Sequence, residues 1–72
     1  MWIRTQDRKK LLEIKDFKIH NDINGRFNIR GFYRDEEVIL GIYETKERAL
    51  EVIYDIQFLI VNNEKLYVMP KE

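Results

Sequence analysis

KERALEVIYDIQFLIV, residues Lys46 to Val61, is the stretch that decides the fold. It is the one segment long and periodic enough to predict a helix, with residues about 100° apart around the axis. Thr45 stands where an N-cap belongs, and Glu47 complements the positive end of the helix dipole. Asn62 and Asn63 can end the helix, because Asn tolerates a left-handed conformation. One side of the helix collects an apolar stripe that needs a sheet to cover it: Ala49, Val52, Ile53, Ile56, Leu59 and Ile60.

The same helix carries a second apolar feature. Tyr54, Phe58 and Val61 have i, i+4, i+7 spacing and point roughly opposite the main stripe. A helix that only covers a sheet is polar on that side. Two interpretations stay open. Either the C-terminal segment folds back over these side chains, or they form a subunit interface, since exposed apolar patches usually mark a contact.

Short alternating segments on both sides of the helix predict strands. They span residues 1–5, 11–15, 17–20, 26–33, 38–43 and 66–69, and Asn24-Gly25 predicts a hairpin turn. Strands followed by a helix favour an α+β fold. We therefore expect one small α+β domain over residues 1–72, with an antiparallel meander sheet of four to five strands and one helix packed on one face.

Size and composition limit the class of protein. The chain has 72 residues and no cysteine, so disulfides and Cys-ligated metals are excluded. A domain this small gains further stability most naturally by association. The longest apolar run, Phe58 to Val61, is far too short for a membrane helix, and early charged residues leave no signal-peptide core. We expect a soluble, cytoplasmic protein.

Charge is divided unevenly along the chain, although the net charge is zero. Residues 1–34 hold nine basic groups against four acidic ones (+5), and residues 35–72 hold four basic groups against nine (−5). The basic half offers a site for an anion, whereas the acidic half repels long polyanions and can pair with a neighbour's basic half. Alternatively, the two halves interleave within one subunit and cancel. We expect no nucleic-acid partner.

Catalytic and metal chemistry find little support in the sequence. The chain has no Ser and no Cys, and its one histidine, His20, lies beside the predicted turn without a positioned partner. Asn21, Asp22 and Asn24 resemble the start of a calcium loop, but a third acidic side chain and the ligand at the twelfth position are missing. We expect no enzyme, no catalytic residue, no metal site and no cofactor.

Aromatic and arginine side chains alternate on two predicted strands. Trp2, Arg4 and Gln6 would project together, and Arg26 and Arg30 repeat the pattern on the strand after the hairpin turn. Guanidinium groups suit phosphates, and aromatic rings suit bases. The alternative is that Trp2 belongs to the core and the arginines only solubilise the outer face of a sheet.

Three segments carry a resemblance to a known group of proteins: MWIRTQD at residues 1–7, LGIYETKERALEV at residues 40–52 and YVMP at residues 67–70. In these the chain resembles very short proteins of phages, prophages and mobile elements of Gram-positive bacteria. In size, class and pocket chemistry it is similar to oligomeric phage proteins that sequester nucleotide signals of host immunity, the Sequestin and Lockin type. This resemblance implies an anti-defence role in the cytoplasm of a host cell.

We therefore expect a non-enzymatic, phage-type binding protein that forms homo-oligomers and holds a small anionic, nucleotide-like ligand at a subunit junction. The alternative is an inhibitor or regulator of a host protein that binds through the second helix stripe without any small ligand. The expected ligand contacts are Trp2, Arg4, Gln6, Arg26 and Arg30, and the expected interface residues are Tyr54, Phe58 and Val61.

Overall fold

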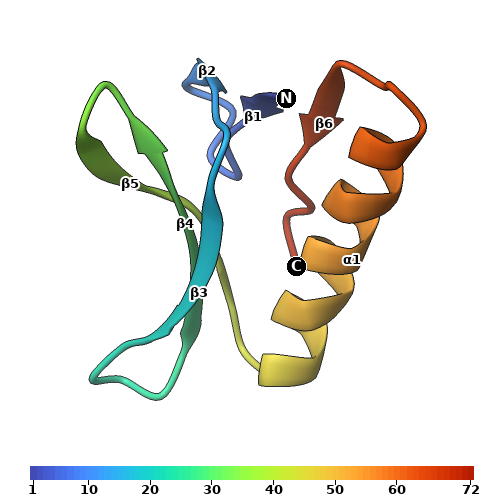
Figure 1. Cartoon of the computed structure of the whole chain (residues 1–72). Coiled ribbons are helices and arrows are strands. Elements are labelled where there is room, and N and C mark those ends of the chain that lie inside the picture. The colour runs from blue at the N-terminus through green and yellow to red at the C-terminus, as the bar shows by residue number, and fades with distance from the viewer.

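The computed structural model describes residues 1–72, which form six strands and one helix (Figure 1). The elements follow in the order β1 (Trp2–Arg4), β2 (Leu11–Glu13), β3 (Phe17–Asn21), β4 (Phe27–Tyr33), β5 (Glu36–Tyr43), α1 (Lys46–Val61) and β6 (Leu66–Val68). Figure 1 shows α1 running along one side of β3, β4 and β5, with β1, β2 and β6 gathered at one end. The predicted α+β class, with a helix packed on a sheet face, is confirmed. No helix is long and apolar enough to cross a membrane.

The strands divide into two three-stranded sheets, where the sequence predicted a single meander of four to five strands. The β1 sheet has the order β2-β1-β6, and β6 runs parallel to β1. The β4 sheet has the order β3-β4-β5, with both pairs antiparallel. The last strand pairs with β1 and not with β5, and Gln6 lies at the edge of β5, where its backbone N–H donates to Leu40 O at 2.9 Å.

Local sequence signals place the ends of the helix and the hairpin turn where they were predicted. Thr45 Oγ1 accepts from Arg48 N at 3.1 Å, and Asn63 takes the left-handed conformation after the last turn, with φ of 60°. Between β3 and β4, Asp22 Oδ1 accepts from Asn24 N at 2.8 Å, and Gly25 has φ of 79°. These contacts close within a few residues, so the sequence alone predicts them.

The core lies between α1 and the inner faces of the two sheets. The packing is closest at Gly31, which has no side chain. A Cβ there would overlap the side chain of Ile14 and lie 3.2 Å from Leu40 Cδ1. Of the predicted helix stripe, three residues are buried and two are half-buried, but Ile60 is 47 % exposed, which corrects the prediction at the last turn. The buried apolar residues are Ile3, Ile14, Ile29, Leu40, Tyr43, Ala49, Val52, Ile56 and Met69.

Candidate functional site

The second helix stripe is open to solvent along its length. Tyr54, Phe58 and Val61 are 62 %, 67 % and 73 % exposed, and we call these three residues the helix outer face. The tail after β6 does not cover them, because it is tied elsewhere: Arg8 Nη1 donates to Met69 O at 2.6 Å and Arg48 Nε donates to Glu72 O at 2.9 Å. The interpretation that the C-terminal segment folds back over the stripe is therefore wrong.

An apolar groove adjoins the helix outer face and was not predicted. It is a hollow of about 170 Å³ between α1 and the edge strand β3, and exposed Ile60 lies in it. A shallower hollow of about 310 Å³ lies over Tyr54 and Phe58, and both hollows include Gln57 and Val61. The apolar surface therefore continues from the helix outer face to β3. The groove is lined by Phe17, Ile53, Ile56, Gln57, Ile60 and Val61.

A second apolar surface covers the outward side of the β1 sheet. In β1, Ile3 is fully buried, so its neighbours Trp2 and Arg4 project to the opposite side, as predicted. Trp2 is 43 % exposed and is not a core residue. The register places apolar side chains of β2 and β6 on the same side, and these are about half-exposed. We call this surface the β1 outer face, and it consists of Trp2, Arg4, Leu11, Leu66 and Val68, with Glu13 beside Trp2.

Arg4 carries a positive charge that nothing in its own chain neutralises. It takes part in none of the four ion pairs of the structure. Its Nε is buried and has no hydrogen-bond partner. Arg30 Nε is buried and unpartnered in the same way, so Arg4 differs from Arg30 in having no ion-pair partner.

Gln6 does not join Trp2 and Arg4, because its side chain turns toward β5. Its Oε1 accepts from Ile42 N at 2.8 Å and its Nε2 donates to Ile42 O at 3.0 Å, which imitates a backbone unit on the edge of β5. The same Nε2 lies 3.2 Å from Pro70 O and 3.0 Å from Lys71 O. The amide is therefore fully engaged in joining β5 to the C-terminal tail.

Arg26 and Arg30 are likewise separated from Trp2 and Arg4. The turn that holds Arg26 lies at the end of the molecule opposite to the β1 sheet in Figure 1, and Arg26 Nε is 3.5 Å from Glu44. Arg30 projects from the middle of β4, with Nη1 3.9 Å from Glu37. A hydrogen bond from Lys18 lowers the pKa of the Glu37 carboxyl, which keeps it available to both cations. Within one chain, only Trp2 and Arg4 of the five predicted ligand contacts lie together.

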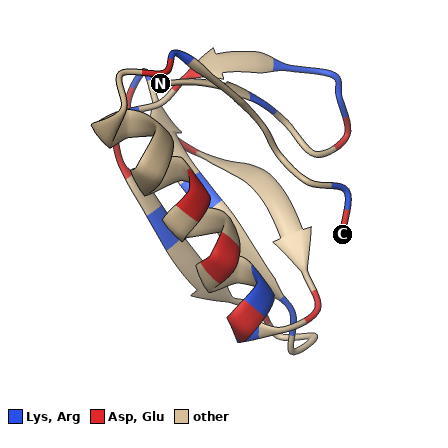
Figure 2. Cartoon of the chain, turned by 90° about the vertical axis from the view of Figure 1, so that its right-hand side faces the viewer, with Lys and Arg blue, Asp and Glu red and all other residues tan.

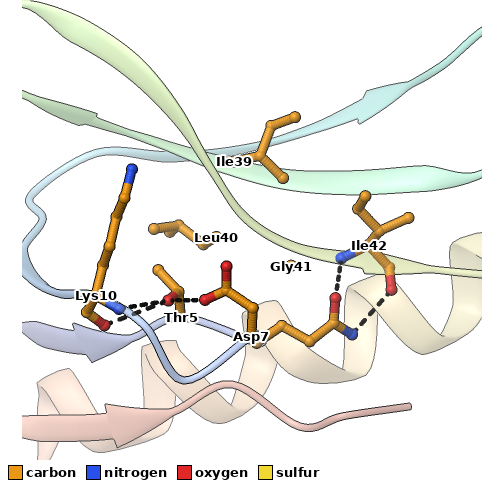
Figure 3. Close-up of a pocket in the computed structure, with 8 residues that line it drawn as sticks. Thr5, Asp7, Lys10, Ile39, Leu40, Gly41 and Ile42 are labelled. Carbon is orange, nitrogen blue, oxygen red and sulfur yellow. Dashed lines mark hydrogen bonds between the residues drawn. The ribbon is translucent and has the colours of Figure 1, made fainter.

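The polar groups that line the hollow beside β5 form hydrogen bonds with groups of the same chain. It measures about 180 Å³ and lies between the turn after β1 and residues 39–42 (Figure 3). Thr5 Oγ1 donates to Asp7 at 2.7 Å and accepts from Lys10 N at 3.1 Å. The backbone N–H of Lys9 and the Thr5 hydroxyl lower the pKa of the Asp7 carboxyl. No hollow of the molecule is lined by Trp2, Arg4, Arg26 or Arg30.

The tyrosine that holds the tail should make the free energy of unfolding depend on pH in the alkaline range. Tyr43 Oη donates to Pro70 O at 2.8 Å, and burial raises the pKa of Tyr43 from 10.0 to about 12. The unfolded chain loses this proton at lower pH than the folded one, so the free energy of unfolding should fall as the pH rises from 10.0 to about 12. Urea unfolding across this interval measures the fall.

Tyr43→Phe provides the control for this pH dependence. Burial, with a contribution from Asp55, also raises the pKa of Tyr67, so part of the alkaline loss should persist in the variant. The variant should be less stable at neutral pH, because Pro70 O loses one of its two donors, and should show a smaller decline at high pH. An equally steep decline in Tyr43→Phe would contradict the assignment to Tyr43.

The structure gathers no group of three or more His, Cys, Asp or Glu side chains that could hold a metal ion. No family model, curated protein or solved structure matches the chain. The surfaces described above are therefore the basis for inferring its function.

Proposed function

We propose that this protein is a non-catalytic binding protein that forms homo-oligomers, and that copies meet through the helix outer face. The observation that carries this proposal is the exposure of Tyr54, Phe58 and Val61, at 62 %, 67 % and 73 %, on a helix whose two ends are capped. Such apolar surfaces usually mark a contact with another molecule.

A second copy of the chain is the partner that best fits this surface. Only 13 of the 72 residues are buried, so the core of one subunit is small and association adds to it. Three of the four ion pairs join the basic half, residues 1–34, to the acidic half, residues 35–72, within one chain, so only charges outside these pairs, such as Arg4, remain for a contact between copies.

The energetics require a contact wider than three side chains. Covering an exposed Tyr, Phe and Val contributes on the order of 3–6 kcal/mol. Association costs about 4–15 kcal/mol in lost translational and rotational freedom. The contact must therefore include further apolar surface, such as the groove beside Ile60.

Sedimentation equilibrium tests the proposal directly. The apparent mass should rise above the 8.9 kDa of one chain as the concentration increases from low micromolar values. A mass of 8.9 kDa at every attainable concentration would contradict self-association. That result would favour the alternative stated in the sequence analysis, in which the helix outer face binds a host protein.

Sequestration of a small anionic, nucleotide-like ligand is the second candidate function. Trp2 beside an unpaired Arg4 supports it, as does the resemblance to phage proteins that capture signals of host immunity. The β1 outer face is flat, whereas small-molecule sites are concave, so a second copy would have to close the site. Gln6, Arg26 and Arg30 are not part of this candidate, because the structure places them away from Trp2 and Arg4, with their side chains directed to other elements.

Calorimetric titration with cyclic and linear nucleotides checks the ligand. The wild-type oligomer should release or absorb heat with at least one nucleotide. The Arg4→Ala variant should still fold but should give no such heat. The matched control is Arg34→Ala, since Arg34 is exposed and stacks on Tyr33, 5.3 Å from its ring centroid. Absence of heat with every nucleotide would remove this candidate.

A further inference from the structure

We infer that the β1 outer face is the surface that receives the helix outer face of a second copy, so that subunits join head to tail. This inference rests on the proposed self-association and names the counterpart of its contact. Figure 1 shows the β1 sheet at one end of the molecule and α1 along its side, as separate parts of the surface.

The first observation is that one chain exposes both surfaces. On the β1 outer face, Trp2, Leu11, Leu66 and Val68 are 43 %, 46 %, 53 % and 46 % exposed, although all four are large and apolar. A symmetric contact of helix against helix would leave this face uncovered in both subunits. A head-to-tail contact covers both apolar surfaces with one kind of interface.

The second observation is charge complementarity. Arg4 lies between Leu11 and Val68 in the sheet register, and it takes part in none of the ion pairs of its own chain. The helix outer face continues toward the start of α1 as a line of exposed acidic residues, Glu47, Glu51 and Asp55, which Figure 2 shows in red. A carboxylate from this line would supply the counter-ion that the Arg4 guanidinium lacks within its own chain.

The same charges disfavour the symmetric alternative. In α1 the acidic residues Glu47, Glu51 and Asp55 outnumber the basic residues Lys46 and Arg48, so two facing helices would each present a net negative charge to the other. Glu51 does pair with Arg48 at 3.1 Å, but this ion pair is exposed and contributes little. The Glu51 carboxylate therefore remains available to Arg4 of another copy.

The third observation is that the groove beside the helix outer face fits an aromatic ring. It is an open hollow of about 170 Å³ whose lining is almost entirely apolar, so an aromatic ring can pack against it. Trp2 is the exposed ring at the centre of the opposing face, and Trp is enriched among residues that dominate interface energies. We place Trp2 of one copy against the helix outer face of the next, at the margin of this groove.

Mixing two variants tests the head-to-tail geometry. Trp2→Asp damages only the receiving face, and Phe58→Asp damages only the helix outer face. Each variant alone should sediment at 8.9 kDa, whereas an equimolar mixture should form a dimer, because one intact contact can still form between the two kinds of chain. The dimer should not grow further, since both of its remaining surfaces are damaged.

The outcomes separate this inference from the proposed function. If the wild type assembles and Trp2→Asp assembles equally well, the β1 outer face is not the counterpart and self-association stands. If both variants are monomers and the mixture stays monomeric, the contact is not head to tail. A monomeric wild type overturns the proposed function itself. These conclusions require each variant to be folded, so its circular dichroism spectrum must match that of the wild type.

Charge reversal supplies a second test that does not depend on Trp2. Arg4→Glu should weaken association at least about tenfold, since breaking a desolvated charge pair is costly. Glu51→Lys should weaken it as well. The chain that carries both substitutions should recover association, because each contact then holds the same two opposite charges with their positions exchanged. No recovery in the double variant, with both single variants weakened, would overturn the pairing of Arg4 with Glu51.

Discussion

Phe58→Asp is expected to convert the assembled protein into a folded monomer of 8.9 kDa. Phe58 is 67 % exposed within its own chain, so the substitution removes few contacts from the subunit. At an interface, the same substitution would bury a charge without a partner, which opposes association strongly. Phe and Asp have similar helix propensities, and a negative charge near the end of the helix costs only about 0.3–1 kcal/mol.

Sedimentation equilibrium and urea unfolding measure the two halves of this expectation. Unfolding should be compared at low protein concentration, because association stabilises the wild type by mass action. The matched control is Phe32→Asp, the same chemical change at a phenylalanine that is 46 % exposed on the β4 sheet. This control should assemble like the wild type. A monomeric Phe32→Asp, or an assembled Phe58→Asp, would contradict the role of the helix outer face.

Gln6→Ala should lower the free energy of unfolding by about 1.5–3 kcal/mol, because the hydrogen bonds lost are each worth about 0.5–1.5 kcal/mol. The variant loses the acceptor of Ile42 N and the donor of Ile42 O, Pro70 O and Lys71 O. These groups are partly exposed, so water replaces some of the loss. For a 72-residue domain of typical stability, at ~0.05–0.15 kcal/mol per residue, this is a large fraction of the total.

Gln57→Ala is the control for Gln6→Ala, since Gln57 is exposed on α1. Both substitutions should be made in the Phe58→Asp background, so that loss of association does not enter the comparison. Gln57→Ala should leave stability unchanged or slightly raise it, because Ala favours helices. Hydrogen exchange should report faster exchange at Ile42 N in Gln6→Ala. Equal stability of the two variants would show that the Gln6 amide does not join β5 to the tail.

The parts of the fold that were predictable depend on neighbouring residues. Thr45, Asn63 and Gly25 act within one turn of chain, so the helix bounds and the hairpin follow from the sequence. The exposure of the second helix stripe was one of two open interpretations, and deciding between them required the path of the tail.

The parts that were not predictable depend on contacts between distant segments. Alternation along β1 placed Gln6 beside Trp2 and Arg4, but the strand ends at Arg4 and the following turn redirects the Gln6 side chain toward β5. The parallel pairing of β6 with β1 joins residues more than sixty positions apart. For Arg30, the alternation was right, but its acidic neighbour on β5 depends on a register that local sequence does not fix.

The parallel pairing of β1 with β6 has a consequence for protein synthesis. Translation proceeds from the N-terminus, so β1 leaves the ribosome early, while its neighbour β6 emerges after every other element of the fold. The β1 sheet can be completed only when residues 66–68 are free to reach it. Nascent chains on one polysome would therefore lack a finished β1 outer face, which delays assembly until each chain has been translated through β6.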